Sequence, residues 1–138
     1  QGPGLYFNKP AFKGSDTVLN ILQGLNADLI VLAGFLWKIP SNLIEAFPNK
    51  IINIHPALLP KYGGKGMYGD KVHKAVKDNK ETETGITIHY VNENYDEGAI
   101  IFQAKTVVES TDDAKTIAQK VHELEYEHYP KVIEKLLS

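Results

Sequence analysis

The 138-residue sequence contains no cysteine, no arginine and no long hydrophobic run. The lack of cysteine excludes thiol catalysis, disulfide bonds and any cysteine-ligated zinc, and it argues against a small secreted disulfide scaffold. All fifteen basic residues are lysine, so no guanidinium group can clamp a carboxylate or a phosphate with two parallel hydrogen bonds. An anionic ligand must therefore be held by backbone N–H groups, lysine or histidine.

The length and charge of the chain are those of a globular protein. Hydrophobic residues make up 43% of the sequence, charged residues 23%, and the formal net charge is -2. This length corresponds to one domain with a sizeable core. The charge balance gives no reason to expect nucleic acid or an anionic membrane as a partner, and no apolar run reaches the length of a bilayer span. We therefore expect a soluble, cytoplasmic protein; the sequence does not indicate its oligomeric state.

The first half of the chain alternates helical patterns with short apolar runs. Helical spacing of apolar residues predicts helices over Ser15–Asn26 and Ser41–Phe47. The run Asp28–Ala33 has no alternation, which is typical of a central strand covered on both faces, and Ile51–His55 is predicted as a second strand. This order of helices and strands is typical of a parallel sheet.

The second half adds strands of a different kind. Glu83–Val91 and Gly98–Val108 alternate apolar and polar residues, as half-covered strands do, and the polar turn between them predicts an antiparallel pair. Asp70–Asp78 is predicted as a helix. The expected fold is an α/β fold with an open, mostly parallel Rossmann-like sheet, helices on both faces, an antiparallel strand pair and a long C-terminal helix.

That C-terminal helix is predicted to begin after Ser110, with Thr111 or Asp112 as its N-cap. Pro130 should kink the helix or restart it. An apolar stripe along the helix is formed by Ile117, Val121, Leu124, Val132, Ile133 and Leu136.

Asn53 and His55 stand at the end of the second predicted strand. Because strand residues alternate between faces, these two side chains should project from the same face. One interpretation makes them a small reaction centre, and the other makes His55 a strand cap whose ring is satisfied by a backbone carbonyl. If the polar turn folds over the strand ends, Asp96 could accept a hydrogen bond from the imidazole and stabilise its protonated form. Asn53 would then be a neutral donor to an oxyanion.

Two loops could border such a centre. The loop 34–40 follows the first strand, and its aromatic and aliphatic residues either form a pocket wall or pack under the next helix. The segment Gly63–Gly69 has four glycines in seven residues but not the order of a Walker loop. We predict that it is a mobile flap over the site.

Another cluster of titratable residues lies on the predicted terminal helix. It consists of His122, Glu125 and His128, at intervals of three residues. Glu-x-x-His resembles the pattern of carboxylate-bridged di-metal sites, but those sites need a second such helix and two further glutamates. Only one copy of the pattern is present, so no metal is expected.

Longer segments of the chain resemble the phosphoribosylglycinamide formyltransferase family, the folate-dependent transferases of purine biosynthesis. The resemblance runs from about Pro10 to Leu137 and is carried by LIVLAGFLW, NIHPALLPKY, GITIHYVNENYDEGAIIFQAK and LEYEHYP. It implies transfer of a formyl group from 10-formyltetrahydrofolate, as co-substrate, to the amine of glycinamide ribonucleotide in de novo purine biosynthesis. The implied partners are these small molecules, with no metal.

The resemblance also assigns site residues by position. Asn53, His55 and Asp96 match the family's catalytic residues. The implied folate-binding residues are Asn53 and the walls of a pteridine pocket: Leu36, Trp37, Lys38, Ile39, Asn92, Glu93, Asn94, Tyr95 and Asp96. The implied substrate-binding residues are His122, Glu123, Leu124 and Glu125, with Glu125 at the position that meets the amine.

The sequence departs from the family pattern at its start. The family's first strand and its Gly-rich Ser-Asn phosphate loop have no match, so residues 1–138 are expected to form a single formyltransferase domain that corresponds to the C-terminal two thirds of the family's domain. Two other functions remain open: a formyltetrahydrofolate deformylase, in which water replaces the amine, and a non-catalytic folate-binding fragment.

Overall fold

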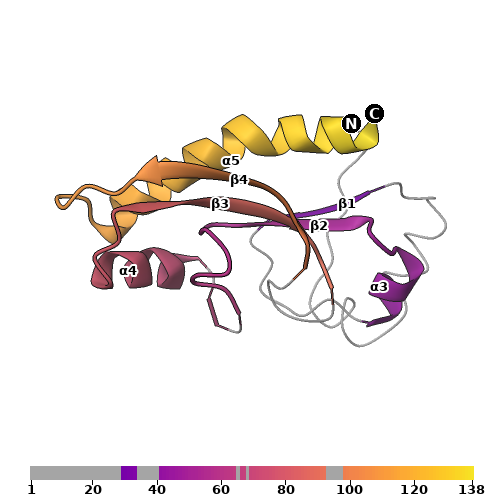
Figure 1. Ribbon diagram of the computed structural model, residues 1–138, viewed down its shortest axis with the longest axis horizontal. Helices are drawn as coiled ribbons and strands as arrows, with labels where there is room; N and C mark the ends of the chain where they lie inside the picture. The colour runs from indigo at the N-terminus through magenta and orange to yellow at the C-terminus, as the bar shows by residue number, and fades with distance from the viewer. Residues whose placement is uncertain (1–28, 34–40, 65, 68, 93–97) are drawn as a thin grey trace.

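The computed structural model describes residues 29–33, 41–64, 66–67, 69–92 and 98–138 (Figure 1). The predicted helix Ser15–Asn26, the predicted pocket wall Leu36–Ile39 and the turn residues Glu93–Asp96 lie outside the described residues.

Four described strands form one sheet in the order β1–β2–β3–β4, with the bounds Ile30–Ala33, Ile51–His55, Glu83–Tyr90 and Ile100–Val107. β1 and β2 are parallel, and the β2–β3 and β3–β4 pairs are antiparallel. The described helices are α3, α4 and α5, with the bounds Ser41–Ala46, Asp70–Asp78 and Ala114–Leu137. The predicted α/β fold, antiparallel pair and long C-terminal helix are confirmed, and the described part of the sheet is mixed.

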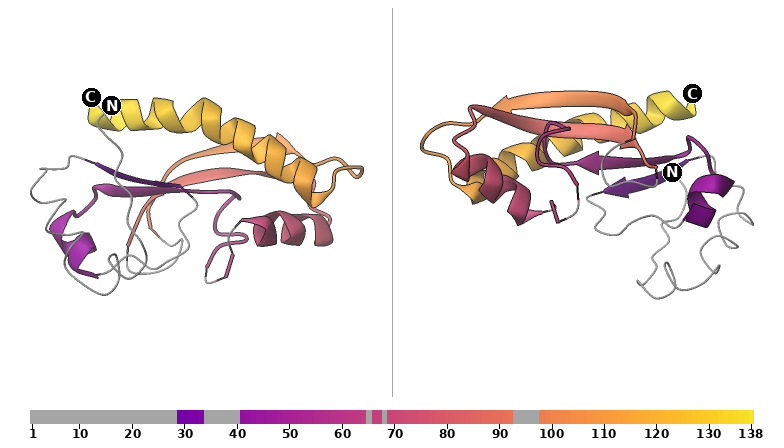
Figure 2. Two further views of the ribbon diagram at one scale, coloured as in Figure 1. Left: turned by 180° about the vertical axis from the view of Figure 1, so that it is seen from behind. Right: turned by 60° about the horizontal axis from the view of Figure 1, so that its bottom comes forward.

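The helices lie on different sides of this sheet. α5 runs along one face, and α3 lies on the other side, near β1 and β2 (Figures 1 and 2). α4 packs against α5. None of the described helices has both the length and the hydrophobicity that a membrane-spanning segment requires.

The main core lies between the sheet and α5. Side chains that alternate along the two central strands point to the same face, because the register pairs Ile54 with Ile88 and Ile52 with Tyr90. The fully buried members of this core are Ile52, Ile54, Val76, Ile86, Ile88, Ile117 and Val121. Burial of each such side chain contributes about 1.5–3 kcal/mol, so α5 is held mainly by its predicted apolar stripe.

The face opposite α5 is polar and also covered. Residues Thr84 to His89 of β3 are all buried, so the prediction of a half-covered strand is wrong. The cover is the chain after β2: Thr87 Oγ1 donates to the carbonyl of Ala57 (2.7 Å) and accepts from the N–H of Leu59 (3.0 Å). Alternation in the sequence could not reveal a cover that bonds to polar side chains.

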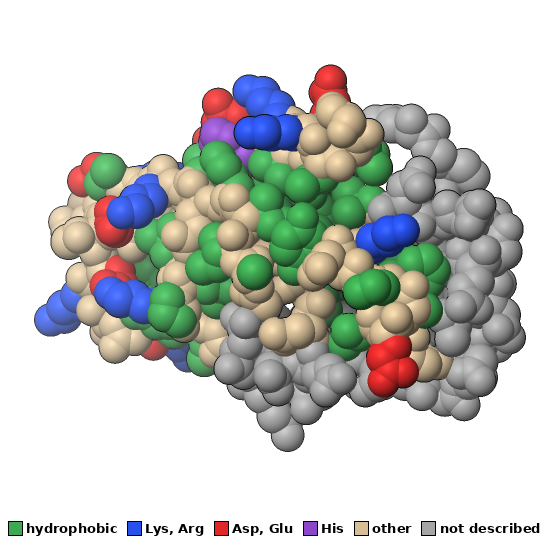
Figure 3. All heavy atoms as spheres, turned by 45° about the vertical axis from the view of Figure 1, so that its right-hand side comes forward, with side chains coloured by type: hydrophobic (Ala, Val, Ile, Leu, Met, Phe, Trp, Pro, Cys, Tyr) green, Lys and Arg blue, Asp and Glu red, His purple; other side chains and the backbone are tan. Residues whose placement is uncertain are grey.

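β1 is less covered than the predicted strand with both faces buried, because Val31 is 41% exposed. Within the described residues, β1 stands at one edge of the sheet. Figure 3 shows hydrophobic side chains gathered in the middle of one face of the molecule, with charged side chains toward its rim.

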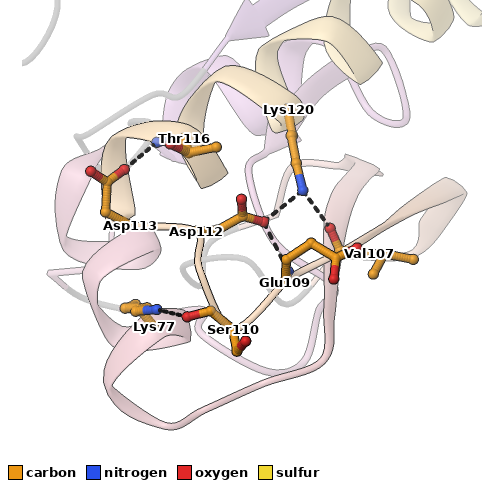
Figure 4. Close-up of polar contacts among 8 residues, drawn as sticks. All are labelled: Lys77, Val107, Glu109, Ser110, Asp112, Asp113, Thr116 and Lys120. Atoms are coloured by element: carbon orange, nitrogen blue, oxygen red, sulfur yellow. Dashed lines mark hydrogen bonds and ion pairs between the residues drawn. The ribbon is translucent and has the colours of Figure 1, made fainter.

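The start of α5 is fixed by two neighbouring carboxylates (Figure 4). Asp113 is the N-cap and accepts from the N–H of Thr116 (2.8 Å), so the prediction of Thr111 or Asp112 as the cap is wrong. Asp112 instead accepts from the N–H of Glu109 (2.8 Å) and from Lys120 Nζ (2.6 Å), which ties the chain after β4 to the helix. α5 continues through Pro130 as one helix, without the restart that was one of the predicted outcomes.

The close packing of β3 on β4 predicts that Gly85→Ala is strongly destabilising. A Cβ at position 85 would lie 1.8 Å from the carbonyl oxygen of Ala104 and 3.0 Å from Leu58 Cδ2. Backbone cannot move aside cheaply, so we expect a loss of about 3 kcal/mol or more in the free energy of unfolding, measured by urea denaturation. The control is Thr82→Ala at an exposed position; equal stability of the two variants would contradict this packing.

The contacts of Asp112 predict a specific acid sensitivity. Its hydrogen bonds to Lys120 and to the N–H of Glu109 lower the pKa of this carboxyl below its ordinary value of 3.8. A lowered pKa in the folded state means that the stabilisation is present above pH 3.8 and is lost as the pH falls through the folded-state value. Asp112→Asn should therefore lower the urea midpoint at pH 7 and weaken its dependence on pH in acid.

The matched control for this prediction is Asp78→Asn, at an exposed position on α4. It should leave both the urea midpoint at pH 7 and the slope of stability in acid close to those of the original protein. If Asp112→Asn behaves like this control, the contacts around Asp112 do not stabilise the start of α5.

Candidate active site

Asn53 and His55 lie on the same face of β2, as predicted. Both side chains are on the side opposite the Ile52 and Ile54 core, and the two residues are 5% and 3% exposed. Across the sheet, Asn53 pairs with His89 and His55 pairs with Thr87. The end of β2 therefore carries an amide and an imidazole in a buried polar layer.

The imidazole of His55 is held by a backbone carbonyl. Its Nε2 lies 2.7 Å from the carbonyl oxygen of Tyr62. A carbonyl oxygen can only accept, so this contact requires a proton on Nε2. The interpretation in which a backbone carbonyl satisfies the ring is therefore correct for this nitrogen. A ring with a fixed orientation and a fixed proton is also what acid-base or electrostatic catalysis needs.

Tyr62 presents this carbonyl from an unusual backbone conformation. Its φ of 56° is in the left-handed region, which costs a residue with a bulky side chain on the order of 1–3 kcal/mol. The phenol donates to Glu81 Oε2 (2.7 Å), and hydrogen bonds to charged groups contribute about 1.5–3 kcal/mol. Burial and the neighbouring Glu81 raise the pKa of Tyr62 to about 12, so the phenol keeps its proton. The side-chain contact thus offsets the cost of the backbone conformation.

The segment that leads from His55 to Tyr62 is clamped at its middle. Gln103 Nε2 donates to the carbonyl of Leu59 (3.0 Å) and to Thr87 Oγ1 (2.9 Å). The Thr87 hydroxyl therefore has one acceptor and two donors around it. This saturated contact fixes the path of residues 57–59 across β3.

The turn that follows β3 begins beside the first residue of β2, at the end of that strand opposite His55. The N–H of Val91 donates to the carbonyl of Ile51 (2.8 Å), so Asn92 lies near the start of β2. His55 is about 13 Å farther along the strand, at roughly 3.3 Å per residue. Asp96 lies outside the described residues, and its predicted contact with His55 requires the turn to fold back along the polar face.

A pocket of about 460 Å³ opens between the start of α4, the end of β2 and α5. It contains two of the predicted substrate-binding residues, His122 and Glu125, whose Nδ1 and Oε1 atoms are 2.7 Å apart. Its lining is Ile54, Pro56, Gly69, Asp70, His73, Ala118, His122, Glu125, Tyr126, Tyr129 and Pro130. Glu123 is exposed and Leu124 packs against the core, so neither lines this pocket.

His73 is a pocket residue that sequence reasoning missed. It is 3% exposed, and its Nδ1 is buried without a hydrogen-bond partner among the residues that the structure describes. Burial, together with the nearby His122 and His55, lowers the pKa of His73, while Asp70 acts in the opposite direction. The ring is therefore neutral at pH 7. Its position three residues before Val76, at the edge of the apolar stripe of α4, was the available signal in the sequence.

The third residue of the C-terminal cluster, His128, lies apart from this pocket. It contacts Glu127 (3.5 Å) and packs its ring against Phe102, with ring centroids 5.1 Å apart. No group of three or more potential metal ligands occurs within the described ranges.

Comparison with known proteins places these residues in a family context. A family model described as formyl transferase matches residues 7–133. Phosphoribosylglycinamide formyltransferase of Bacillus subtilis is 40% identical over 135 residues, which cover 98% of this chain and 66% of that protein. The chloroplastic enzyme of Arabidopsis thaliana is 43% identical over 136 residues, which cover 95% of this chain and 47% of the relative. The chain thus spans about half to two thirds of the length of these relatives.

Solved structures give the same result. Glycinamide ribonucleotide transformylase 1 from Geobacillus kaustophilus matches with a TM-score of 0.81 and 34% identity, over 96% of this chain and 67% of the other. A formyltetrahydrofolate deformylase from Pseudomonas syringae matches with a TM-score of 0.77 and 26% identity, over 91% of this chain and 39% of the other. The family model covers nearly the whole chain, and the strand that ends in Asn53 and His55 lies within its match. The chain belongs to the formyl transferase family.

Proposed function

We propose that this chain transfers a formyl group from 10-formyltetrahydrofolate to the amine of glycinamide ribonucleotide. The observation that carries the proposal is the end of β2, where the side chains of Asn53 and His55 are buried side by side. The residue after His55, Pro56, lines the pocket that contains His122 and Glu125. The relatives in Arabidopsis thaliana and Bacillus subtilis bear the name of this activity.

In the proposed reaction the amine nitrogen attacks the formyl carbon and a tetrahedral oxyanion forms. Asn53 as an amide and His55 as an imidazolium donate to this oxyanion, and each donor lowers the barrier by about 2.7–4 kcal/mol. The bond from the formyl carbon to the folate nitrogen then breaks, and His55 gives a proton to that nitrogen. The attacking nitrogen loses one proton as the new amide forms, and this proton restores the charged form of His55. Asp96 keeps His55 charged and oriented in this mechanism.

The chemistry of the pocket supports its use for the amine end of the substrate. The described lining includes two carboxylates, Asp70 and Glu125, and no lysine. Such a set favours an amine or hydroxyl groups over a phosphate. Glu125 is the residue we propose to accept a hydrogen bond from the amine, with His122 as its partner, and the flanking Glu123 and Leu124 complete the proposed segment.

The folate side of the site is proposed from the family resemblance. Its residues are the segment Leu36–Ile39, Asn53 and the turn Asn92–Asp96. We propose that residues 1–138 act as a single formyltransferase domain. A cytoplasmic location stays a prediction, and the Arabidopsis thaliana relative is named chloroplastic.

The proposed roles predict large losses of turnover in three single variants. Asn53→Ala and His55→Ala each remove one oxyanion donor and should lower kcat by about 10²–10³-fold. Asp96→Asn removes the charge that holds His55 protonated and should also lower kcat by orders of magnitude. Folate binding, measured by calorimetry with a folate analogue, should survive in His55→Ala.

The matched control is His128→Gln, which changes a histidine of α5 outside the pocket and should keep kcat. Because His128 packs on Phe102, unfolding of each variant is followed by circular dichroism. Rates near those of the original protein in both His55→Ala and Asp96→Asn would contradict the proposed mechanism.

A hydrolytic deformylase is the second candidate, favoured by the structural match to the Pseudomonas syringae deformylase. The two reactions differ in their requirement for the amine. We expect consumption of 10-formyltetrahydrofolate only when glycinamide ribonucleotide is present, measured by absorbance and by detection of the formylated product. Consumption without the amine, with formate as product, would identify the deformylase.

Calorimetry separates both enzymes from a non-catalytic folate-binding fragment. A formyltransferase should bind the folate analogue and the ribonucleotide. Binding of the folate analogue without binding of the ribonucleotide, and without turnover, would favour the fragment.

A further inference from the structure

We propose that Tyr62 is a positioning residue for His55, acting through its backbone carbonyl, with Glu81 as the anchor of its side chain. This inference rests on the proposed function for its catalytic meaning, but the geometry of the ring contact is independent of it. The Tyr62 phenol bonds to Glu81, and its carbonyl bonds to His55. One residue thus joins the end of α4 to the candidate catalytic ring.

The first step is the direction of the carbonyl. It lies 2.7 Å from His55 Nε2 because Tyr62 adopts a left-handed backbone conformation, with φ of 56°. In an ordinary extended or right-handed conformation the preceding chain would have to follow another path to bring the carbonyl to the same place. The orientation of the imidazole therefore depends on a conformation that a tyrosine rarely adopts.

The second step is what holds that conformation. The phenol oxygen is 2.7 Å from Glu81 Oε2, and Lys61 Nζ lies 3.6 Å from the same carboxylate oxygen. The Tyr62 ring also packs against residues of the main core. Glu81 follows α4 and is tied to it, because its N–H donates to the carbonyl of Val76 (3.2 Å). The anchor is therefore part of the folded framework.

The third step is the path of the chain between the end of β2 and Tyr62. The Thr87 hydroxyl bonds to Ala57 and Leu59, and Gln103 bonds to the carbonyl of Leu59. Residues 57–59 are thus fixed on β3 before the chain reaches Tyr62. The N–H of Lys61 also donates to the carbonyl of Leu58 (3.1 Å), so the chain between Leu59 and Tyr62 is held as a turn and brings the Tyr62 carbonyl to a defined position.

The consequence concerns the proton on His55. The carbonyl requires a hydrogen on Nε2, which both the neutral Nε2–H ring and the imidazolium of the proposed mechanism carry. Loss of the anchor should let the carbonyl move and let the ring populate other orientations. A small misplacement of a catalytic group is enough to slow a reaction substantially.

The test compares Tyr62→Phe and Glu81→Ala with two controls. Each of the first two variants removes the phenol–carboxylate contact and should lower kcat by roughly tenfold to a hundredfold with little change in KM. Glu81→Gln keeps an oxygen that accepts from the phenol and should retain most of the rate. Glu83→Gln removes the neighbouring exposed ion pair with Lys105 (3.6 Å) and should have no effect on kcat. The Tyr62→Phe/Glu81→Ala double variant should be no slower than either single variant.

A second readout does not depend on activity. Long-range ¹H–¹⁵N spectra of the histidine rings, assigned with His55→Gln, report which ring nitrogen carries the proton. We expect one set of His55 ring signals in the original protein, with a hydrogen-bonded Nε2–H whether the ring is neutral or charged, and shifted or averaged signals in Tyr62→Phe and Glu81→Ala. Glu81→Gln should restore the signals of the original protein.

The outcomes separate the two hypotheses. A change in the His55 ring signals together with the kcat losses supports the positioning role. If the ring signals change in the variants but the original protein shows no formyl transfer, the proposed function is refuted and the positioning of His55 by Tyr62 is still supported. Formyl transfer at an unchanged rate in Tyr62→Phe, with unchanged ring signals and only a lower melting temperature, would overturn the positioning role and leave Tyr62 as a structural residue.

Discussion

The alternation of side chains along β2 is the constraint on which the rest of the structure depends. Ile52 and Ile54 point into the core under α5, and Asn53 and His55 point to the opposite face. A slip of one residue in the register would bury the amide and imidazole in the apolar core and expose the two isoleucines to the polar layer. The hydrophobic core therefore does more than stabilise the fold, because its register places the candidate catalytic pair.

The polar layer opposite α5 is ordered by hydrogen bonds. A buried hydroxyl or imidazole is costly unless it is paired, and the chain after β2 supplies the partners from its own backbone. Thr87 fixes residues 57–59, and the carbonyl of Tyr62 meets His55. Tyr62 therefore connects the His55 ring, through its own carbonyl, to Glu81, which follows α4.

The pocket beside α5 is lined by titratable side chains. Its described lining carries Asp70, Glu125 and two histidines, and His73 is kept neutral by burial and by its histidine neighbours. This described lining contains no lysine, and the chain has no arginine, so its charged and titratable groups are carboxylates and imidazoles. Carboxylate and imidazole groups suit an amine or a hydroxyl group better than a phosphate.

The sequence by itself predicted the described helices and strands, and it placed Asn53 and His55 on one face of a strand. It could do so because periods of two and of about 3.6 residues are local properties of the chain. It also indicated the family, through long segments such as NIHPALLPKY. Only the tertiary structure decided that β3 is covered on both faces, that Asp113 caps α5, that His73 lines the pocket beside α5, and that the carbonyl of Tyr62 meets His55. Each of these depends on contacts between residues distant in sequence or on a backbone angle, and neither leaves a periodic signal in the chain.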